Sequence, residues 1–90
     1  MSDIFKDRSF GGTLRDIRIE NNLTMREMCK LCAMDVGNYS RLEASRLSPP
    51  RSKQAILKIV KNIKCDEFKK NWLVDAAYSF HLGALRERFK

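Results

Sequence analysis

Asn38, Ser40 and Arg41 are the side chains whose types and spacing best suit a defined chemistry, hydrogen bonding to the edges of nucleic-acid bases. Arginine can donate two hydrogen bonds to a guanine, and asparagine can both donate to and accept from an adenine. Such groups read a base sequence only when a rod narrow enough for the major groove carries them. The chain must therefore place these residues on one exposed helix face.

A short helix from Asp35 to Ala44 meets that requirement. Asp35 is a good N-cap because its carboxylate can accept a hydrogen bond from an early backbone N–H group of the helix. Tyr39 and Leu42 are spaced three positions apart, which predicts that both face inward. The remaining, mostly polar surface of this helix holds Val36, Gly37, Asn38, Ser40 and Arg41.

Another short helix precedes it and begins with a capping box at Thr24 and Glu27. In such a box the threonine accepts from an early backbone N–H group, and the glutamate reaches back to the threonine N–H. The apolar stripe that follows consists of Met28, Cys29 and Cys32. A capped helix, a tight turn and a second helix with a polar outer face form the signature of a helix-turn-helix motif.

The cysteines form one C-x-x-C pair, Cys29 and Cys32, and one isolated residue, Cys65. A zinc site needs a fourth ligand, and the one histidine, His81, lies far along the chain. Cys29 and Cys32 fall on a buried helix stripe, where cysteine packs as a small hydrophobe. We therefore predict no metal site and no cofactor, with metal binding and redox chemistry as the alternatives.

Length and charge limit the classes of function. Ninety residues make one domain, and a net charge of +7 favours a polyanionic partner such as DNA, RNA or an anionic membrane surface. A solubilising surface charge is the alternative. No apolar run suits a membrane span and no signal peptide is recognisable, so we expect a cytoplasmic, nucleoid-associated protein. No catalytic motif is found, and we do not expect an enzyme.

The whole chain reads as all-α, with about five helices. We expect an N-terminal arm over residues 1–9 and a flexible joint at Gly11 and Gly12. The DNA-binding part spans residues 10–64, and residues 65–90 form a C-terminal helix and tail that begin at the N-cap Asp66 and are interrupted at Gly83. Besides the two helices above, we expect helices over residues 13–21 and 52–64, and a loop over 44–50 because Pro49 and Pro50 cannot lie inside a helix.

The sequence resembles the Cro and phage-repressor type of helix-turn-helix regulators, the XRE family. The likeness covers about Phe10 to Ile63 and is carried by FGGTLRDIRIENNLT and by LTMREMCKLCAMDVGNYSRLEASRLSPP. Ala33 and Ser45 stand where the family usually has glycine, Met25 stands where a polar residue is usual, and the loop after Ser45 is a little longer. The resemblance implies a five-helix, lambda-repressor-like fold.

The same resemblance implies roles for individual residues. The base-reading positions are Val36, Gly37, Asn38, Ser40 and Arg41, with Arg41 the best candidate for a guanine contact. Arg18 and Glu43 occupy the positions of a structural salt bridge that joins the first helix to the recognition helix. Apart from the resemblance, the N-terminus of the preceding helix and the basic and hydroxyl residues nearby predict phosphate contacts that flank the recognition helix, at Thr24, Arg26, Ser45, Arg46, Arg51 and Lys53.

A single domain of this kind contacts little DNA, and a two-fold dimer on an inverted repeat is the usual remedy. We expect the dimer surface on the C-terminal helix and tail, at Trp72, Ala76, Phe80, Leu82, Leu85 and Phe89; the alternative is that this helix closes the core of the monomer. The predicted function is a dimeric transcriptional repressor that binds double-stranded DNA, with autoregulation as its form of control, of the kind found in phages and mobile elements.

Two rival functions remain open. One is a protein-binding module, such as an antitoxin, that uses Leu31, Leu47 and the apolar tail to hold another protein. The other is RNA binding by the basic surface, which is disfavoured because few exposed aromatic residues are expected for base stacking.

Overall fold

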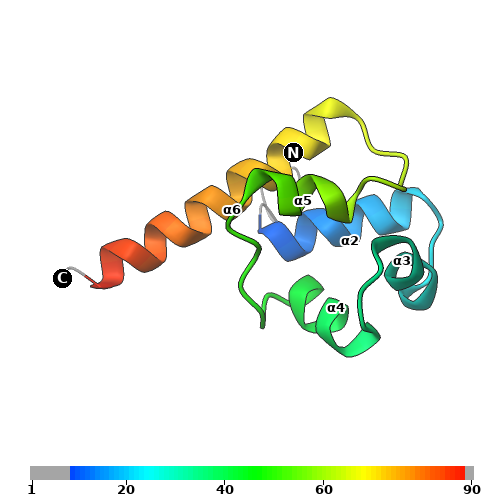
Figure 1. Cartoon of the computed structure of the whole chain (residues 1–90), viewed down its shortest axis with the longest axis horizontal. Coiled ribbons are helices and arrows are strands. Elements are labelled where there is room, and N and C mark those ends of the chain that lie inside the picture. The colour runs from blue at the N-terminus through cyan, green and yellow to red at the C-terminus, as the bar shows by residue number, and fades with distance from the viewer. Residues whose placement is uncertain (1–8, 89–90) are drawn as a thin grey trace, which may run out of the picture.

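The computed structural model describes residues 9–88, and within them it contains five α-helices and no strand (Figure 1). The predicted all-α class is confirmed. The helices are α2 (Phe10–Glu20), α3 (Met25–Cys32), α4 (Val36–Glu43), α5 (Lys53–Ile59) and α6 (Glu67–Arg88). None of these helices is long and apolar enough to cross a membrane.

Helix α2 lies at the centre of the fold and contacts both α4 and α6, while α3 packs against α4 and α5. The C-terminal half of α6 extends beyond the other helices (Figure 1). Leu73 and Ala77 of α6 are buried together with residues of α2 and α4, so residues 10–64 and the first half of α6 share one core. That core consists of Phe10, Leu14, Ile17, Met28, Cys29, Tyr39, Leu42, Ile56, Ile59, Val60, Ile63, Leu73 and Ala77.

The start of α2 differs from the prediction. Ser9 is the N-cap, and its hydroxyl accepts a 3.0 Å hydrogen bond from the Gly12 backbone N–H. Gly11 and Gly12 are therefore buried residues of the first helical turn, and the predicted flexible joint is wrong. Glycine is unfavourable inside a helix, but packing decides here, because Gly11 lies against the end of α4. Residues 1–8 of the predicted arm lie outside the described residues.

Two other predicted boundaries are also corrected. Helix α5 is capped by Ser52 and ends at Ile59, not at Lys64, because the chain turns at Val60 so that Ile63 also reaches the core. Helix α6 continues through Gly83 to Arg88 without the predicted interruption, since one glycine weakens a helix without ending it. The predicted cap of α6 is confirmed, because Asp66 Oδ1 accepts a 2.9 Å hydrogen bond from the Lys69 N–H.

Helices α2, α3 and α4 are each followed by a non-glycine residue with left-handed backbone geometry, at Asn22, Ala33 and Ser45 (φ 55°, 57° and 63°). In each case the next residue's N–H donates back to a carbonyl five positions earlier. These hydrogen bonds run from Leu23 to Arg18 (3.1 Å), from Met34 to Cys29 (3.0 Å) and from Arg46 to Arg41 (2.7 Å). Such a closing turn satisfies helix-end carbonyls and usually contains glycine.

Ala33 is the residue of the three whose side chain has no polar group to offset this geometry. Ala33→Gly is expected to raise the free energy of unfolding by about 0.5–1 kcal/mol, since relief of the left-handed strain exceeds the added freedom of the unfolded chain. Urea unfolding measures the change. Ala44→Gly is the matched control, because Ala44 has a φ of −84° and glycine should lower stability there. Equal losses in both variants would contradict the prediction.

The predicted capping box at the start of α3 is confirmed. The Thr24 hydroxyl accepts from the Glu27 N–H at 3.2 Å, and Glu27 Oε1 accepts from the Thr24 N–H at 2.8 Å. The hydrogen bond from the Thr24 backbone lowers the pKa of Glu27, and the Thr24 hydroxyl adds to the effect. The folded state therefore favours the ionised carboxylate.

This lowered pKa predicts a pH dependence. The stabilisation is present above the unfolded-state pKa of Glu27 and is lost as the pH falls through its folded-state pKa. Between about pH 6 and pH 3, the wild type should lose more stability than Glu27→Gln, whose neutral amide oxygen still accepts from the Thr24 N–H. Urea titrations at several pH values compare the two proteins. Parallel pH profiles would argue against a contribution from Glu27 ionisation.

Candidate nucleic-acid interface

Helix α4 has one buried face and one open face. Tyr39 and Leu42 are buried and anchor the helix to the core, as their spacing predicts. All five residues proposed to read bases are exposed, and they share the outward side of this helix: Val36, Gly37, Asn38, Ser40 and Arg41. The side chains on this face include apolar, amide, hydroxyl and guanidinium groups but no carboxylate, since Asp35 only caps the helix.

Asn38 and Arg41 form a pair on the open face. Arg41 Nη1 donates a 3.0 Å hydrogen bond to Asn38 Oδ1, one helical turn earlier. The Asn38 backbone N–H in turn donates to Asp35 Oδ2 at 3.2 Å. A guanidinium has five N–H donors, so this contact restrains Arg41 along the helix and leaves donors available for a ligand.

Arg18 and Glu43 join α2 to the end of α4. The two side chains form a bidentate ion pair, with Arg18 Nε to Glu43 Oε2 and Arg18 Nη2 to Glu43 Oε1 both at 3.0 Å. Only 16% of the arginine side chain and 6% of the glutamate side chain are exposed. Arg18 Nη1 also donates to the Leu23 carbonyl at 3.1 Å. The pair therefore fixes both the orientation of α4 and the turn into α3.

The Tyr39 hydroxyl is buried next to this ion pair. Burial raises the pKa of Tyr39 above its ordinary range, and the neighbouring Glu43 carboxylate raises it further. The hydroxyl makes no hydrogen bond of good geometry to any residue that the structure describes. Tyr39 is therefore a core residue and cannot stack on a base.

The predicted phosphate contacts come from three exposed segments on either side of α4 in the chain. Thr24 and Arg26 lie at the start of α3, Ser45 and Arg46 directly follow α4, and Arg51 and Lys53 lie around the start of α5. The Thr24 hydroxyl accepts a hydrogen bond from the Glu27 N–H, which fixes this side chain at the exposed start of α3. Met25 is half-buried and packs against the core, which leaves the polar neighbours to face outward.

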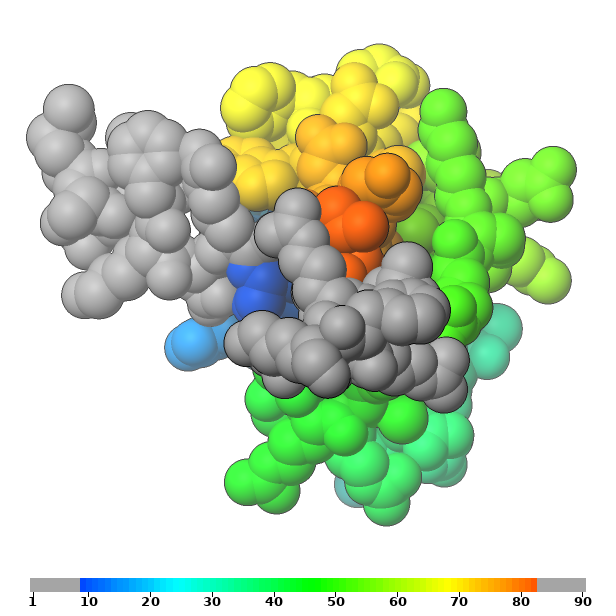
Figure 2. Space-filling view, turned by 90° about the vertical axis from the view of Figure 1, so that its left-hand side faces the viewer, coloured from blue at the N-terminus to red at the C-terminus, as the bar shows by residue number. Residues whose placement is uncertain are grey.

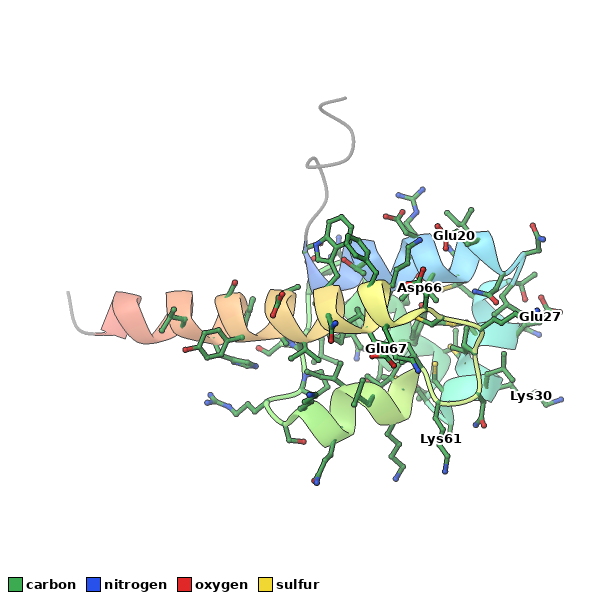
Figure 3. All side chains as sticks on the ribbon, turned by 90° about the horizontal axis from the view of Figure 1, so that it is seen from above. Glu20, Glu27, Lys30, Lys61, Asp66 and Glu67 are labelled. Atoms are coloured by element: carbon green, nitrogen blue, oxygen red, sulfur yellow. The ribbon has the colours of Figure 1, made fainter. Side chains whose placement is uncertain are left out.

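Several acidic residues lie at a different end of the molecule. Figure 3 shows Glu20, Asp66 and Glu67 where α2 ends and α6 begins, with Glu27 near the same end. Lys69 pairs with Glu20, and Lys70 with Glu67, so part of this negative charge is neutralised locally. The outward face of α4 itself carries the guanidinium of Arg41, while Asp35 at its start is engaged by the Asn38 N–H.

A groove of about 890 Å³ lies between the start of α2, the segment after α4, and α6. Figure 2 shows this side of the molecule, with α6 in yellow and orange beside the green segment that follows α4. Most of its lining is apolar: Phe10, Leu42, Leu47, Pro49, Phe68, Trp72, Ala76 and Phe80. Sequence periodicity gave no sign of this groove, because it arises only when three distant segments meet.

The residues predicted to form a dimer surface fall partly in this groove. Trp72 and Phe80 line it, Trp72 is half-buried, and 46% of Phe80 is exposed. Leu82 is half-buried on α6. The Leu85 side chain and the whole of Phe89 lie outside the described part of the chain.

The cysteines lie in packed surroundings. Cys29 is buried, Cys32 and Cys65 are half-buried, and all three are free thiols. Burial raises the pKa of Cys32 to about 11 and also raises the pKa values of Cys29 and Cys65. The thiolate forms that bind metals are thereby disfavoured. Over residues 9–88, no group of three or more potential ligands lies close enough together to hold a metal ion.

The outward face of α4 is mostly polar, and the Arg18–Glu43 ion pair holds the end of this helix against α2. The apolar groove lies beside the segment that follows α4. No family model, no curated protein and no solved structure matches this chain.

Proposed function

We propose that this protein is a sequence-specific DNA-binding regulator with a lambda-repressor-like arrangement, whose α4 enters the major groove. The observation that supports this most directly is the open face of α4. Five small or polar residues share that face, while Tyr39 and Leu42 on the opposite face are buried. A helix held by its buried side and free on its polar side is the form that base recognition requires.

In the proposed complex, each segment around α4 has a separate task. Arg41 contacts a guanine, and Asn38 holds its guanidinium in place through the 3.0 Å hydrogen bond. Gly37 allows a close approach of the helix backbone to the bases. The N-terminus of α3, with Thr24 and Arg26, contacts one phosphate strand, while Arg46, Arg51 and Lys53 contact phosphates on the other side.

We further propose that the regulator acts as a repressor and as a homodimer. Two copies would place their α4 helices one DNA turn apart, roughly 34–36 Å, on an inverted repeat. Occupation of a promoter would then block transcription without an activation surface. The groove residues Trp72 and Phe80 are part of the expected dimer surface.

Selection of bound fragments from a random DNA pool tests this function. An inverted repeat with half-sites about one helical turn apart is the expected product, and titration at two salt concentrations should give a specific affinity far above that for random DNA. Selection that yields no motif, with only weak, salt-sensitive binding, would overturn the proposal.

Arg41→Ala provides the residue-level prediction. Loss of a bidentate guanine contact is expected to weaken binding to the selected sequence by about tenfold or more, with a smaller effect on random DNA. Lys53→Ala is the control, because loss of a phosphate contact should weaken both complexes alike. Fluorescence anisotropy with both DNAs measures the difference. Equal losses on both DNAs for Arg41→Ala would remove its base-reading role.

A second candidate function is a module that binds another protein, as an antitoxin does. The groove supports it, since exposed Leu47 and Phe80 both line that cavity. Leu31 contributes less, because it is half-buried against the core and its carbonyl accepts a hydrogen bond from Asn62. This function predicts that DNA binding is weak or depends on the partner, which the same selection experiment would reveal.

A further inference from the structure

The groove beside α6 has a charge that contrasts with the rest of the chain. The protein carries a net charge of +7, yet the groove lining formed by the described side chains contains one carboxylate, Asp75, and no basic side chain. A surface of that kind would repel a phosphate backbone. It is suited to an occupant that is apolar and basic.

The end of α6 has that composition. The sequence from His81 onward reads HLGALRERFK, with three basic residues, Arg86, Arg88 and Lys90, against one acidic residue, Glu87. Leu82, Leu85 and Phe89 recur at helical spacing among them, and Phe89 and Lys90 directly follow the last residue of α6. This half of α6 extends beyond the other helices of its own copy (Figure 1). A second copy of the chain can therefore supply a segment that matches the groove in both polarity and charge.

We propose that the groove is the binding site, here called the seat, for the C-terminal end of α6 from a second copy of the chain. The two copies form a two-fold dimer in which their α6 helices run antiparallel. A two-fold axis near Phe80 would pair positions equally far from Phe80 in the two helices. Residues 81–88 of one helix would then lie opposite residues 72–79 of the other, and each stretch is about 12 Å long. Arg86 of one copy would then lie within a turn of Asp75 of the other. In a two-fold dimer each groove holds the helix end of the other copy, so both grooves are filled and both helix ends are buried.

This seat connects the dimer to the proposed DNA-binding face. Leu47 and Pro49 line the groove in the segment between α4 and α5, which also carries Arg46 and Arg51. His81 Nε2 lies 2.8 Å from the Pro49 carbonyl oxygen, which can only accept, so this hydrogen bond holds the segment against α6. The second copy would thus support the segment that follows the recognition helix. The inference takes its homodimer from the proposed function but does not depend on DNA.

Sedimentation equilibrium of the full chain without DNA tests the seat. The wild type is expected to be a dimer, and Phe80→Ala is expected to raise the dimer dissociation constant by about tenfold or more. Tyr78→Ala is the matched control, since Tyr78 is an exposed aromatic residue on the same helix that does not line the groove. Circular dichroism would verify that both variants keep the helical content of the wild type.

Charge exchange adds a more specific measurement. Asp75→Arg should give a monomer, and the further changes Arg86→Asp and Arg88→Asp should restore the dimer. A wild type that remains a monomer, or a dimer that Phe80→Ala and Asp75→Arg leave unchanged, would overturn the proposal. A monomer that binds an apolar dye in the groove would reassign the groove to a small apolar ligand. Failure of the DNA selection alone would leave this result intact, because no step of the assay contains DNA.

Discussion

Glu43→Ala is expected to lower the free energy of unfolding by about 3 kcal/mol. The change removes the carboxylate that receives two 3.0 Å hydrogen bonds from Arg18 and leaves the guanidinium largely buried. A residual charge without its partner accounts for most of such a loss. Because Arg18 keeps its contact with the Leu23 carbonyl and 16% of its side chain stays exposed, we place the loss at the lower end of the range for buried pairs.

A double-mutant cycle measured by urea unfolding separates the pair from its parts. The cycle compares Arg18→Met, Glu43→Leu and both changes together. The double variant leaves no charge stranded and should recover a large share of the stability that Glu43→Leu loses. Glu67→Ala is the control, because Glu67 pairs with Lys70 on an exposed surface and should cost less than about 0.5 kcal/mol. Similar losses for Glu43→Ala and Glu67→Ala would mean that the buried pair contributes no more to the free energy of unfolding than an exposed pair.

Gly11→Ala is the second change with a large expected effect, also about 3 kcal/mol. A β-carbon at Gly11 would lie 2.8 Å from the Glu43 carbonyl carbon and closer still to the carbonyl oxygens of Leu42 and Glu43. These are backbone atoms, so a side-chain rotation cannot relieve the clash. Helices α2 and α4 would have to move apart, which would disturb the core around Leu42 and lengthen the Arg18–Glu43 contact.

The same substitution at Gly37 is the control. A β-carbon there would lie 3.0 Å from Asp35 Oδ2, a side-chain atom at the surface that can shift. Gly37→Ala should therefore leave stability unchanged or raise it by about 0.5 kcal/mol through better helix propensity. Thermal unfolding compares the two variants. Equal stability of Gly11→Ala and the wild type would mean that the α2–α4 crossing is looser than described.

The sequence revealed those features that depend on residues close together in the chain. The capping box at Thr24, the N-caps Asp35 and Asp66 and the buried pair Tyr39 and Leu42 all follow from local spacing. Helix-forming and capping rules are short-range, so such features can be read before the fold is known. The Arg18–Glu43 contact was expected from resemblance, because no local rule links residues so far apart in the chain.

The features that were missed depend on tertiary contacts. Two glycines in sequence favour a flexible joint, yet the close approach of α4 makes Gly11 part of a packed helix. An apolar run through Ile63 favours a longer α5, but the chain turns at Val60 to bring that residue to the core. The groove needs Phe10, Leu47 and Trp72 to meet, and nothing in the spacing of these three residues signals that meeting.

The lengths of α3, α4 and α5 have a consequence for folding. These helices have 8, 8 and 7 residues, whereas an isolated helix shorter than about 12–15 residues is marginal in water. Each therefore depends on packing against its neighbours, α4 against α2, α5 against α6, and α3 against α4 and α5, and an excised two-helix peptide would be largely unstructured. The face of α4 cannot melt on its own ahead of the core. The exposed face of α4 should be lost in the same cooperative transition as the core, so a contact of the proposed kind with DNA would last only while the whole domain stays folded.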